Sequence, residues 1–174
     1  MPGRIRLEDR ECPLSTTAQH VGEWWTLLIL HDAFDGYTRF DQFQQNLGIS
    51  TSMLTARLKT LVAEGLLERR PYQDKPARYE YVLTERGRSL RPVIVALAAW
   101  GNRHLAPHER SMILVDAASG EEVEPVLVDA RTGRRLDDSA AFVFAAGPAA
   151  STAMRLRYTE HAHRADPGRL GADT

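Results

Sequence analysis

The feature that most constrains the fold is a series of four short helical patterns that ends in two strand patterns. Apolar residues recur at helical spacing over about 15–21, 23–34, 38–47 and 50–64, and strand-like segments follow over 66–72 and 78–83. A glycine stands at or just beyond the end of each helical pattern. Residues 73–77 are polar and include Pro76, so the two strands are expected to form a hairpin with a charged tip. This order predicts an α+β fold.

The helix expected over residues 50–64 has two distinct faces. Ser50 is a good N-cap, and the apolar stripe consists of Met53, Leu54, Leu58, Leu61 and Val62. The opposite face offers Thr51, Ser52, Thr55, Ala56, Lys59 and Thr60, with Arg57 at its border. At 1.5 Å per residue this helix is a rod of roughly 22 Å. A rod with a small, polar outer face fits the major groove of DNA.

A helix pair followed by a basic hairpin is the order of elements in a winged helix-turn-helix. In such a fold the first helix of the pair (38–47) braces the second, whose outer face reads base edges, while the hairpin reaches flanking phosphates. The candidate DNA-binding residues are Arg39, Ser50, Thr51, Ser52, Thr55, Arg57, Lys59, Arg69, Arg70, Tyr72, Lys75, Arg78 and Tyr79. For Arg39 an ion pair with Asp35 or Asp41 is an equal alternative. Ser50 is favoured as a cap, and some hairpin cations would stay solvated.

The distribution of charge agrees with a nucleic-acid partner better than the net charge does. The whole chain carries a net charge of −1. Residues 55–91, however, contain nine basic and five acidic side chains, and the rest of the chain is correspondingly acidic. A mildly acidic protein with one basic segment can bind DNA through that segment.

The combined pattern resembles the HxlR-type bacterial transcriptional regulators. The resemblance rests on Cys12-Pro13, residues 22–30, 39–43, 48–50, 53–54, 57–59 and Leu61, then 65–72, 78–84 and Gly87. It implies a homodimer bound to a palindromic double-stranded DNA operator. It also implies dimer contacts from the N-terminal segment and from a long C-terminal helix. Residues 84–87 lead into this helix, which the apolar stripe over 90–105 predicts, with Pro92 in its first turn. Repression by occluding a promoter is the simplest mode of action.

Cys12 is the single cysteine of the chain, so an internal disulfide or a multi-cysteine zinc site is excluded. In some members of the family that the chain resembles, the equivalent cysteine is an oxidant sensor that links two subunits. Cys12 is therefore a candidate redox sensor. Arg10 favours its thiolate, whereas Asp9 and Glu11 oppose it. Control by an unidentified small-molecule effector, and no control at all, are the alternatives.

The C-terminal part contains an internal repeat, in which Ile113–Val123 is echoed by Val126–Leu136. Each copy predicts a small hairpin around a Ser-Gly or Thr-Gly turn, and residues 141–144 would add a strand. Longer family members carry Cys-Gly turns in a zinc-knuckle-like pattern, but here the sulfur positions correspond to Ser119, Asp129 and Thr132. No metal is expected, and the segment would support the dimer or line a small-ligand pocket.

We therefore divide the chain into a leader, residues 1–13; a winged-helix and dimerisation domain, 14–106; a small β-rich appendage, 107–150; and a flexible tail, 151–174. His161 and His163 in the tail form only a weak metal signal. The adjacent Trp24 and Trp25 lie on a helix that is apolar nearly all round and are expected in the core.

Several classes of function are not expected. No phosphate-binding loop, nucleophile elbow or catalytic constellation occurs, so neither an enzyme nor a cofactor is predicted. The longest apolar run, Trp24–Leu30, is too short to span a bilayer, and the first residues lack a secretory signal, so a cytoplasmic protein is expected. The alternative to DNA binding is a winged-helix module that binds another protein.

Overall fold

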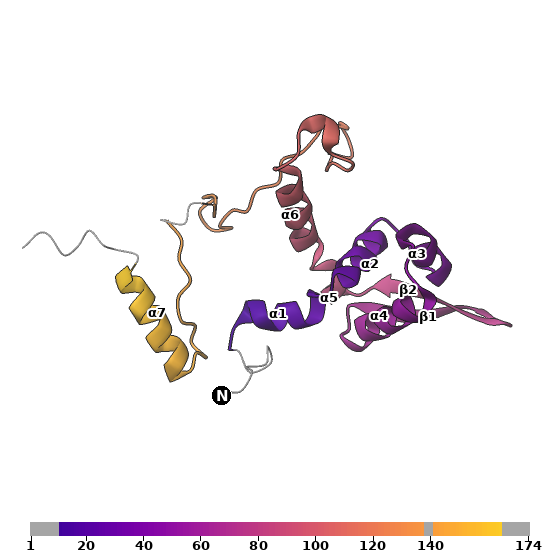
Figure 1. The fold of residues 1–174 in the computed structure, drawn as a ribbon, viewed down its shortest axis with the longest axis horizontal. Coiled ribbons are helices and arrows are strands. Elements are labelled where there is room, and N and C mark those ends of the chain that lie inside the picture. The colour runs from indigo at the N-terminus through magenta and orange to yellow at the C-terminus, as the bar shows by residue number, and fades with distance from the viewer. Residues whose placement is uncertain (1–10, 138–140, 165–174) are drawn as a thin grey trace, which may run out of the picture. The chain divides into compact units, whose positions relative to one another are not determined.

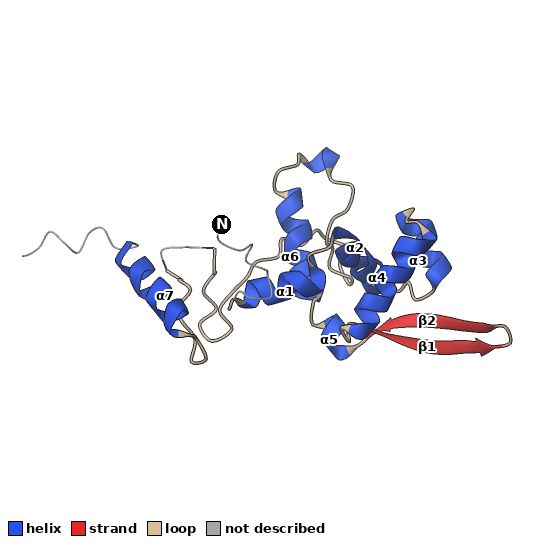
Figure 2. Ribbon diagram, turned by 60° about the horizontal axis from the view of Figure 1, so that its bottom comes forward, coloured by secondary structure: helices blue, strands red, loops and turns tan. Residues whose placement is uncertain are grey.

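The computed structural model describes residues 11–137 and 141–164, and the side chains of its last helix as far as Thr159. Residues 17–126 form one compact unit, and the remaining described residues belong to a second. The first unit contains the winged helix-turn-helix. Figures 1 and 2 show its helices and its hairpin.

The elements of the chain follow the expected order through the hairpin. They are α1 (Pro13–Val21), α2 (Trp24–Phe34), α3 (Phe40–Leu47), α4 (Thr51–Ala63), β1 (Leu67–Asp74) and β2 (Ala77–Leu83). After the hairpin come α5 (Glu85–Arg88), α6 (Arg91–Asn102), the 3₁₀ turn η2 (Pro107–Glu109) and α7 (Thr152–Arg164). The α+β helix-turn-helix with a small antiparallel sheet is thus confirmed.

The core of this unit lies between α2, α3, α4 and the start of the hairpin. Its largest fully buried side chains are Phe43, Ile29, Leu30, Leu54, Leu58, Leu61, Leu66 and Leu67. Three of them, Leu54, Leu58 and Leu61, recur at spacings of four and three along α4, which presses one face of that helix onto the core. Burial of this face leaves the other face of α4 for a partner.

The turn between α3 and α4 is short and well defined. Gly48 caps α3 in the left-handed conformation, with φ of 62°, and its N–H donates to the Gln44 carbonyl. Ser50 then begins α4, because its Oγ accepts the Met53 N–H at 3.3 Å. A side-chain bond also joins α2 to α3, since Asn46 Nδ2 lies 3.0 Å from both carboxylate oxygens of the buried Asp32. The helix pair is therefore held by capping and by side-chain bonds as well as by the core.

Strands β1 and β2 form a two-stranded antiparallel sheet in which Leu67 lies opposite Leu83. Figure 2 shows this hairpin projecting beyond the helices. Its base is attached to the start of α3 by backbone contacts. The Tyr81 N–H donates to the Thr38 carbonyl at 2.7 Å, and the backbones of Arg39 and Glu80 form an isolated antiparallel β-bridge. The wing thus has a fixed point of attachment next to the helix pair.

The helix expected from the apolar stripe over 90–105 is shorter than predicted, because α6 covers only Arg91–Asn102. The residues that lead into it, Glu85–Arg88, form a separate single turn, α5. Pro92 lies in the first turn of α6, where its missing N–H is harmless. The same residue prevents α5 from running on into α6, since proline can neither donate the helical bond nor accommodate the preceding turn.

The two repeats form turns but hardly any sheet. In the first unit, Asp116 Oδ1 accepts the N–H groups of Ala118 and Ser119, and a single bridge joins Val115 to Glu122. In the second unit, Asp129 builds the same turn, and the bridge joins Val128 to Arg135. Within the described part of 107–150, pairing does not extend beyond such single bridges, because the turns have no neighbouring strand against which to pack.

Two further expectations differ from the structure. Residues 141–144 lie in a turn and loop rather than in a strand. Residues 152–164, expected as a flexible tail, form α7, whose start is stabilised by Ser151 Oγ accepting the Met154 N–H at 3.2 Å. Arg155 Nη2 also donates to the Pro148 carbonyl at 2.8 Å. The side chains of His161 and His163 lie outside the described residues.

Candidate nucleic-acid interface

The outer face of α4 is the first component of the candidate interface. Its exposed residues are Thr51, Ser52, Thr55, Ala56 and Lys59. At 100° per residue they fall on one side of the helix, opposite the buried leucines. This side is built of short side chains around one flexible cation, so a nucleic acid can approach the helix backbone closely.

Hydrogen bonds orient the hydroxyl groups at the start of α4. Gln44 Nε2 donates to Thr51 Oγ1 at 2.8 Å, which connects α3 to the first turn of α4. Thr55 Oγ1 donates to the Thr51 carbonyl at 2.7 Å. Ser50, which caps the helix, has its Oγ 3.3 Å from Ser52 Oγ. The capping interpretation of Ser50 is confirmed, and the first turn presents positive backbone N–H groups to an anion.

Arg57 does not join this face. Its Nη2 pairs with Glu23 Oε2 at 3.1 Å, at the residue that precedes α2, and its side chain is only 24% exposed. The helical rotation explains the difference, because residue 57 lies about 160° around the axis from Lys59. The structure therefore separates Arg57 from the other candidates on α4, and placing it at the border of the outer face was wrong.

The wing carries the second component, a set of cations that rest on tyrosine rings. The Arg69 guanidinium carbon lies 3.3 Å from the centroid of the Tyr79 ring, across the hairpin. The Arg39 guanidinium carbon lies 4.6 Å from the centroid of Tyr72. Cation–π contacts of this kind restrict the guanidinium groups without neutralising their charge. Arg39 thus connects the start of α3 to the wing, instead of pairing with Asp35 or Asp41.

Other wing cations differ in their availability. Arg70 Nη2 pairs with Glu68 Oε2 at 2.8 Å, and the hydrogen bond and charge of this carboxylate raise the pKa of Arg70. The same bond lowers the pKa of Glu68. Lys75 and Arg78 stand exposed near the tip, with no ion pair to any residue that the structure describes. The tip therefore offers two unpaired cations, beside the exposed carboxylate of Asp74, whereas Arg70 is partly neutralised.

Sequence reasoning missed residues that position the interface without forming it. Gln42 Oε1 accepts the N–H groups of Thr38 and Arg39 and so caps α3. A glutamine three residues after the start of a helix is a recognisable capping signal. Gln44, which holds the Thr51 hydroxyl, has no such local signal, because its partner lies across the turn.

The described residues do not suggest another kind of site. Among them, no cluster of three or more His, Cys, Asp or Glu side chains is arranged to hold a metal ion. No helix in the described part of the chain is long and apolar enough to cross a membrane. A braced helix with a small polar outer face, followed by a cationic hairpin, defines the class: a winged helix-turn-helix protein of the DNA-binding type.

Comparison with known proteins gives the family. Residues 20–109 match the family model of the HxlR-like helix-turn-helix, and the chain belongs to this family. The resemblance seen in the sequence is thereby confirmed. The assignment identifies the protein as an HxlR-type transcriptional regulator.

Relatives from several bacteria support the assignment. An uncharacterised HTH-type transcriptional regulator of Mycobacterium tuberculosis is 45% identical over 117 residues, which cover 67% of this chain and 74% of the relative. The uncharacterised HTH-type transcriptional regulator YdeP of Bacillus subtilis is 37% identical over 94 residues, covering 53% of this chain and 73% of YdeP. Both names describe regulators of transcription.

Solved structures agree in fold. A Pseudomonas aeruginosa protein described as a candidate transcription factor shares 46% identity and covers 84% of this chain and 99% of its own, with a TM-score of 0.63. The redox regulator HypR in its oxidised form shares 33% identity and covers 55% of this chain and 99% of its own, with a TM-score of 0.51.

Proposed function

We propose that the protein is a sequence-specific regulator that binds a palindromic operator as a homodimer and represses transcription by occluding a promoter. The observation that carries the proposal is the exposed, small and polar face of α4 beside the exposed cations of the wing. The face of α4 reads base edges in the major groove, and the wing contacts phosphates beside it.

Different residues contribute different kinds of contact. Thr55 and Lys59 extend from the middle of the outer face toward base edges, and Ala56 leaves room for a thymine methyl group. Thr51 and the N–H groups of the first turn bind a phosphate. Lys75 and Arg78 at the wing tip bind phosphates of the flanking groove, and Arg69, restrained over Tyr79, adds a preorganised cation.

Exposed apolar side chains supply the dimer contacts of the proposal. On α6, Val93, Leu97 and Trp100 are 43%, 48% and 64% exposed and lie on one side of the helix. Trp24, expected in the core, is 61% exposed and stacks on Trp25 with ring centroids 4.0 Å apart. Large apolar groups in contact with water favour association, and a second copy would cover them.

Cys12 provides a second means of control. It lies immediately before α1, and its carbonyl accepts the Thr16 N–H at 3.1 Å, so it occupies the N-terminal end of that helix. The similarity to HypR, a redox regulator, supports oxidation of Cys12 to an intersubunit disulfide as the switch. A small-molecule effector is the other form of control.

The test begins with selection of bound duplexes from a random-sequence DNA pool, followed by fluorescence anisotropy between about 50 and 200 mM salt. We expect an enriched palindrome with half-sites about 10 base pairs apart, because a two-fold dimer places its two α4 helices on successive major grooves. Affinity should fall steeply with salt. Enrichment without a palindrome would refute the dimeric mode.

Substitutions then locate the contacts. Lys59→Ala should weaken binding to the selected DNA about tenfold and relax its sequence preference. The double variant Lys75→Ala, Arg78→Ala should reduce the slope of log affinity against log salt by about 1.8, since each phosphate contact contributes about 0.9. Arg131→Ala, which removes one exposed cation in the other unit, is the matched control and should change neither.

The same experiment tests the alternative function, a winged-helix module that binds another protein. A winged helix that binds protein through an apolar surface would enrich no DNA sequence, and its association would respond little to salt. This outcome, with the fold unchanged, would overturn the DNA-binding proposal.

A further inference from the structure

The unit of residues 17–126 contains a cavity of about 650 Å³ that the DNA-binding face does not use. One wall is the C-terminal part of α2 together with α6, and the other is the segment from Arg110 to Pro125. Pockets for organic ligands generally measure about 300–1,000 Å³ and combine apolar walls with a few polar groups. The cavity has the size of such a pocket.

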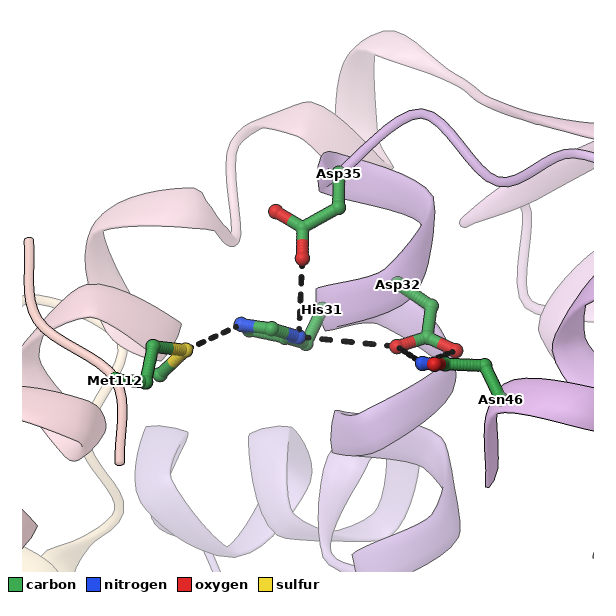
Figure 3. Close-up of polar contacts among 5 residues, drawn as sticks. All are labelled: His31, Asp32, Asp35, Asn46 and Met112. Carbon is green, nitrogen blue, oxygen red and sulfur yellow. Dashed lines mark hydrogen bonds and ion pairs between the residues drawn. The ribbon is translucent and has the colours of Figure 1, made fainter. Parts of the chain in front are cut away.

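The second wall is fixed by side-chain contacts, so the cavity exists before any ligand enters. Asn102 Nδ2, on α6, donates to the Met112 carbonyl at 2.9 Å. His31 Nε2, on α2, lies 3.2 Å from Met112 Sδ, as Figure 3 shows. Arg110 pairs with Glu122 at 2.9 Å and closes the segment on itself. A preformed pocket avoids the entropy cost of ordering its wall on binding.

The walls combine polar and apolar side chains, and the apolar ones are incompletely covered. On the α6 side, the cavity is lined by Ile94, Val95, Ala98 and Ala99. The two alanine side chains are short and project little from the helix. From the other wall, Met112, Ile113 and Val123 are 46%, 44% and 39% exposed. Apolar side chains that face an open space on both walls favour a flat or slender apolar guest between them.

Two arginines of the cavity lining are available to bind an anion. Asp35 faces the His31 ring, with Oδ2 3.6 Å from Nδ1, and Glu122 is paired with Arg110. Arg91 and Arg103, at opposite ends of α6, line the cavity without an ion pair to any described residue; Arg91 lies over the Phe34 ring. Two lining carboxylates, Glu124 and Asp35, likewise pair with no arginine or lysine within the described chain. The lining therefore offers two arginines that can pair with an anion, in a site whose formal charges balance.

From this combination we propose that the cavity between α2, α6 and residues 110–125 is an effector site for an amphipathic organic anion. An aromatic or alkyl body lies between the small residues of α6 and the Met112 wall. Its carboxylate pairs with an arginine at one end of α6.

The position of the cavity explains how such a ligand would act, a step that rests on the proposed function. The cavity-lining residues of α6 lie on the side of the helix opposite Val93, Leu97 and Trp100. The other wall helix, α2, contributes Ile29 and Leu30 to the core that supports α4. A ligand that displaces α6 from α2 therefore changes the dimer surface and the support of the DNA-reading helix together.

Binding is tested first without DNA, so that the result does not depend on operator recognition. Isothermal titration calorimetry of the full-length protein uses naphthalene-2-carboxylate and dodecanoate, with the neutral amides 2-naphthamide and dodecanamide as their uncharged isosteres. We expect one of the two anions to bind, and to bind at least about tenfold more tightly than its uncharged counterpart, because a charge-assisted hydrogen bond is lost in the amide. The aromatic and the alkyl anion distinguish the two kinds of body.

Two substitutions place the ligand. Ala98→Phe fills the cavity and should reduce affinity at least about tenfold. The pair Arg91→Gln, Arg103→Gln should remove the preference for the anion while keeping the weaker binding of the amide, and Arg131→Gln is the matched control. Circular dichroism and the oligomeric state should match wild type in each variant. If Ala98→Phe does not fold, the arginine pair still decides.

Several results would overturn the proposal: no binding of either anion up to about 1 mM, equal binding of anion and amide, or unchanged binding in the arginine pair. The regulatory step is measured separately, as the shift in affinity for the selected DNA at saturating anion. Anion binding without that shift would refute the coupling and leave the DNA-binding function intact. Loss of DNA binding with intact anion binding would refute the proposed function and leave the site.

Discussion

Replacing Gly87 with alanine tests the packing that joins α5 to the base of the wing. A Cβ atom at position 87 would lie 2.1 Å from the Leu66 carbonyl oxygen and 3.1 Å from Leu83 Cδ2. Since real Cβ atoms hardly ever approach other atoms within 3.0 Å, the backbone would have to shift by roughly 1 Å. Leu66 resists such a shift because it is only 2% exposed.

The expected cost follows from these contacts. Overpacking of a close-packed site costs about 1–3 kcal/mol. The Leu66 carbonyl also accepts the Thr84 N–H at 3.1 Å and the Thr84 hydroxyl at 3.2 Å, and weakening these bonds adds about 1 kcal/mol. The total, about 2–4 kcal/mol, should lower Tm by about 10–25 °C in a unit of this size.

Thermal unfolding followed by circular dichroism measures this change. The matched control is Gly101→Ala on α6, where a Cβ meets no atom within 4 Å and the backbone is helical, so alanine should stabilise by about 0.5–1 kcal/mol. If Gly87→Ala melts within about 2 °C of wild type, the close approach of Gly87 to Leu66 is not a feature of the folded protein.

Three further predictions concern single side chains. Burial raises the pKa of Asp32 and the Asn46 bond offsets this only in part, so the folded state binds a proton more readily than the unfolded state. Ionisation of Asp32 therefore lowers the free energy of unfolding as pH rises from the usual aspartate pKa through the raised one. Urea titrations at several pH values should show this decline in wild type relative to Asp32→Asn. Unfolding free energies that change with pH in the same way in both proteins would contradict it. Ser50→Ala should cost about 1 kcal/mol in urea unfolding, because the Met53 N–H loses its cap, whereas Ser52→Ala, which removes no cap, should cost less than about 0.5 kcal/mol. Mild oxidation should give a dimer band on a non-reducing gel that Cys12→Ser abolishes, and a band that persists in the variant would exclude the disulfide switch.

The helix-turn-helix and the wing were predictable because their signals are local. Glycine after a helical pattern, a serine N-cap and a leucine stripe at spacings of three and four set the limits of α4 to within a residue or two. The hairpin followed from two strand-like segments around a proline-containing turn. In these elements local preference and tertiary packing agree, so the sequence pattern was sufficient.

The remaining parts depended on contacts that a periodic pattern does not contain. The stripe over 90–105 predicted one long helix, but α6 ends at Asn102, and the separate turn α5 precedes it. The repeats have the turn residues of hairpins but no partner strand, so they remain turns. Arg57 was assigned by its charge, whereas its rotation around α4 directs it to Glu23. The cation–π contacts of Arg39 with Tyr72 and of Arg69 with Tyr79 join residues distant in sequence, so no local pattern predicts them.

The division of labour within α4 has a consequence for how such a regulator can diversify. Ser50 and Thr51 take part in hydrogen bonds that hold the helix pair together, and the leucines of the opposite face form the core. Within the described structure, the side chains of Ala56 and Lys59 take no part in these hydrogen bonds or in the core. These two positions can therefore change at little cost in folding, and a library randomised there should yield folded proteins with new operator preferences. Recognition can be rewritten on this helix while its scaffold stays the same.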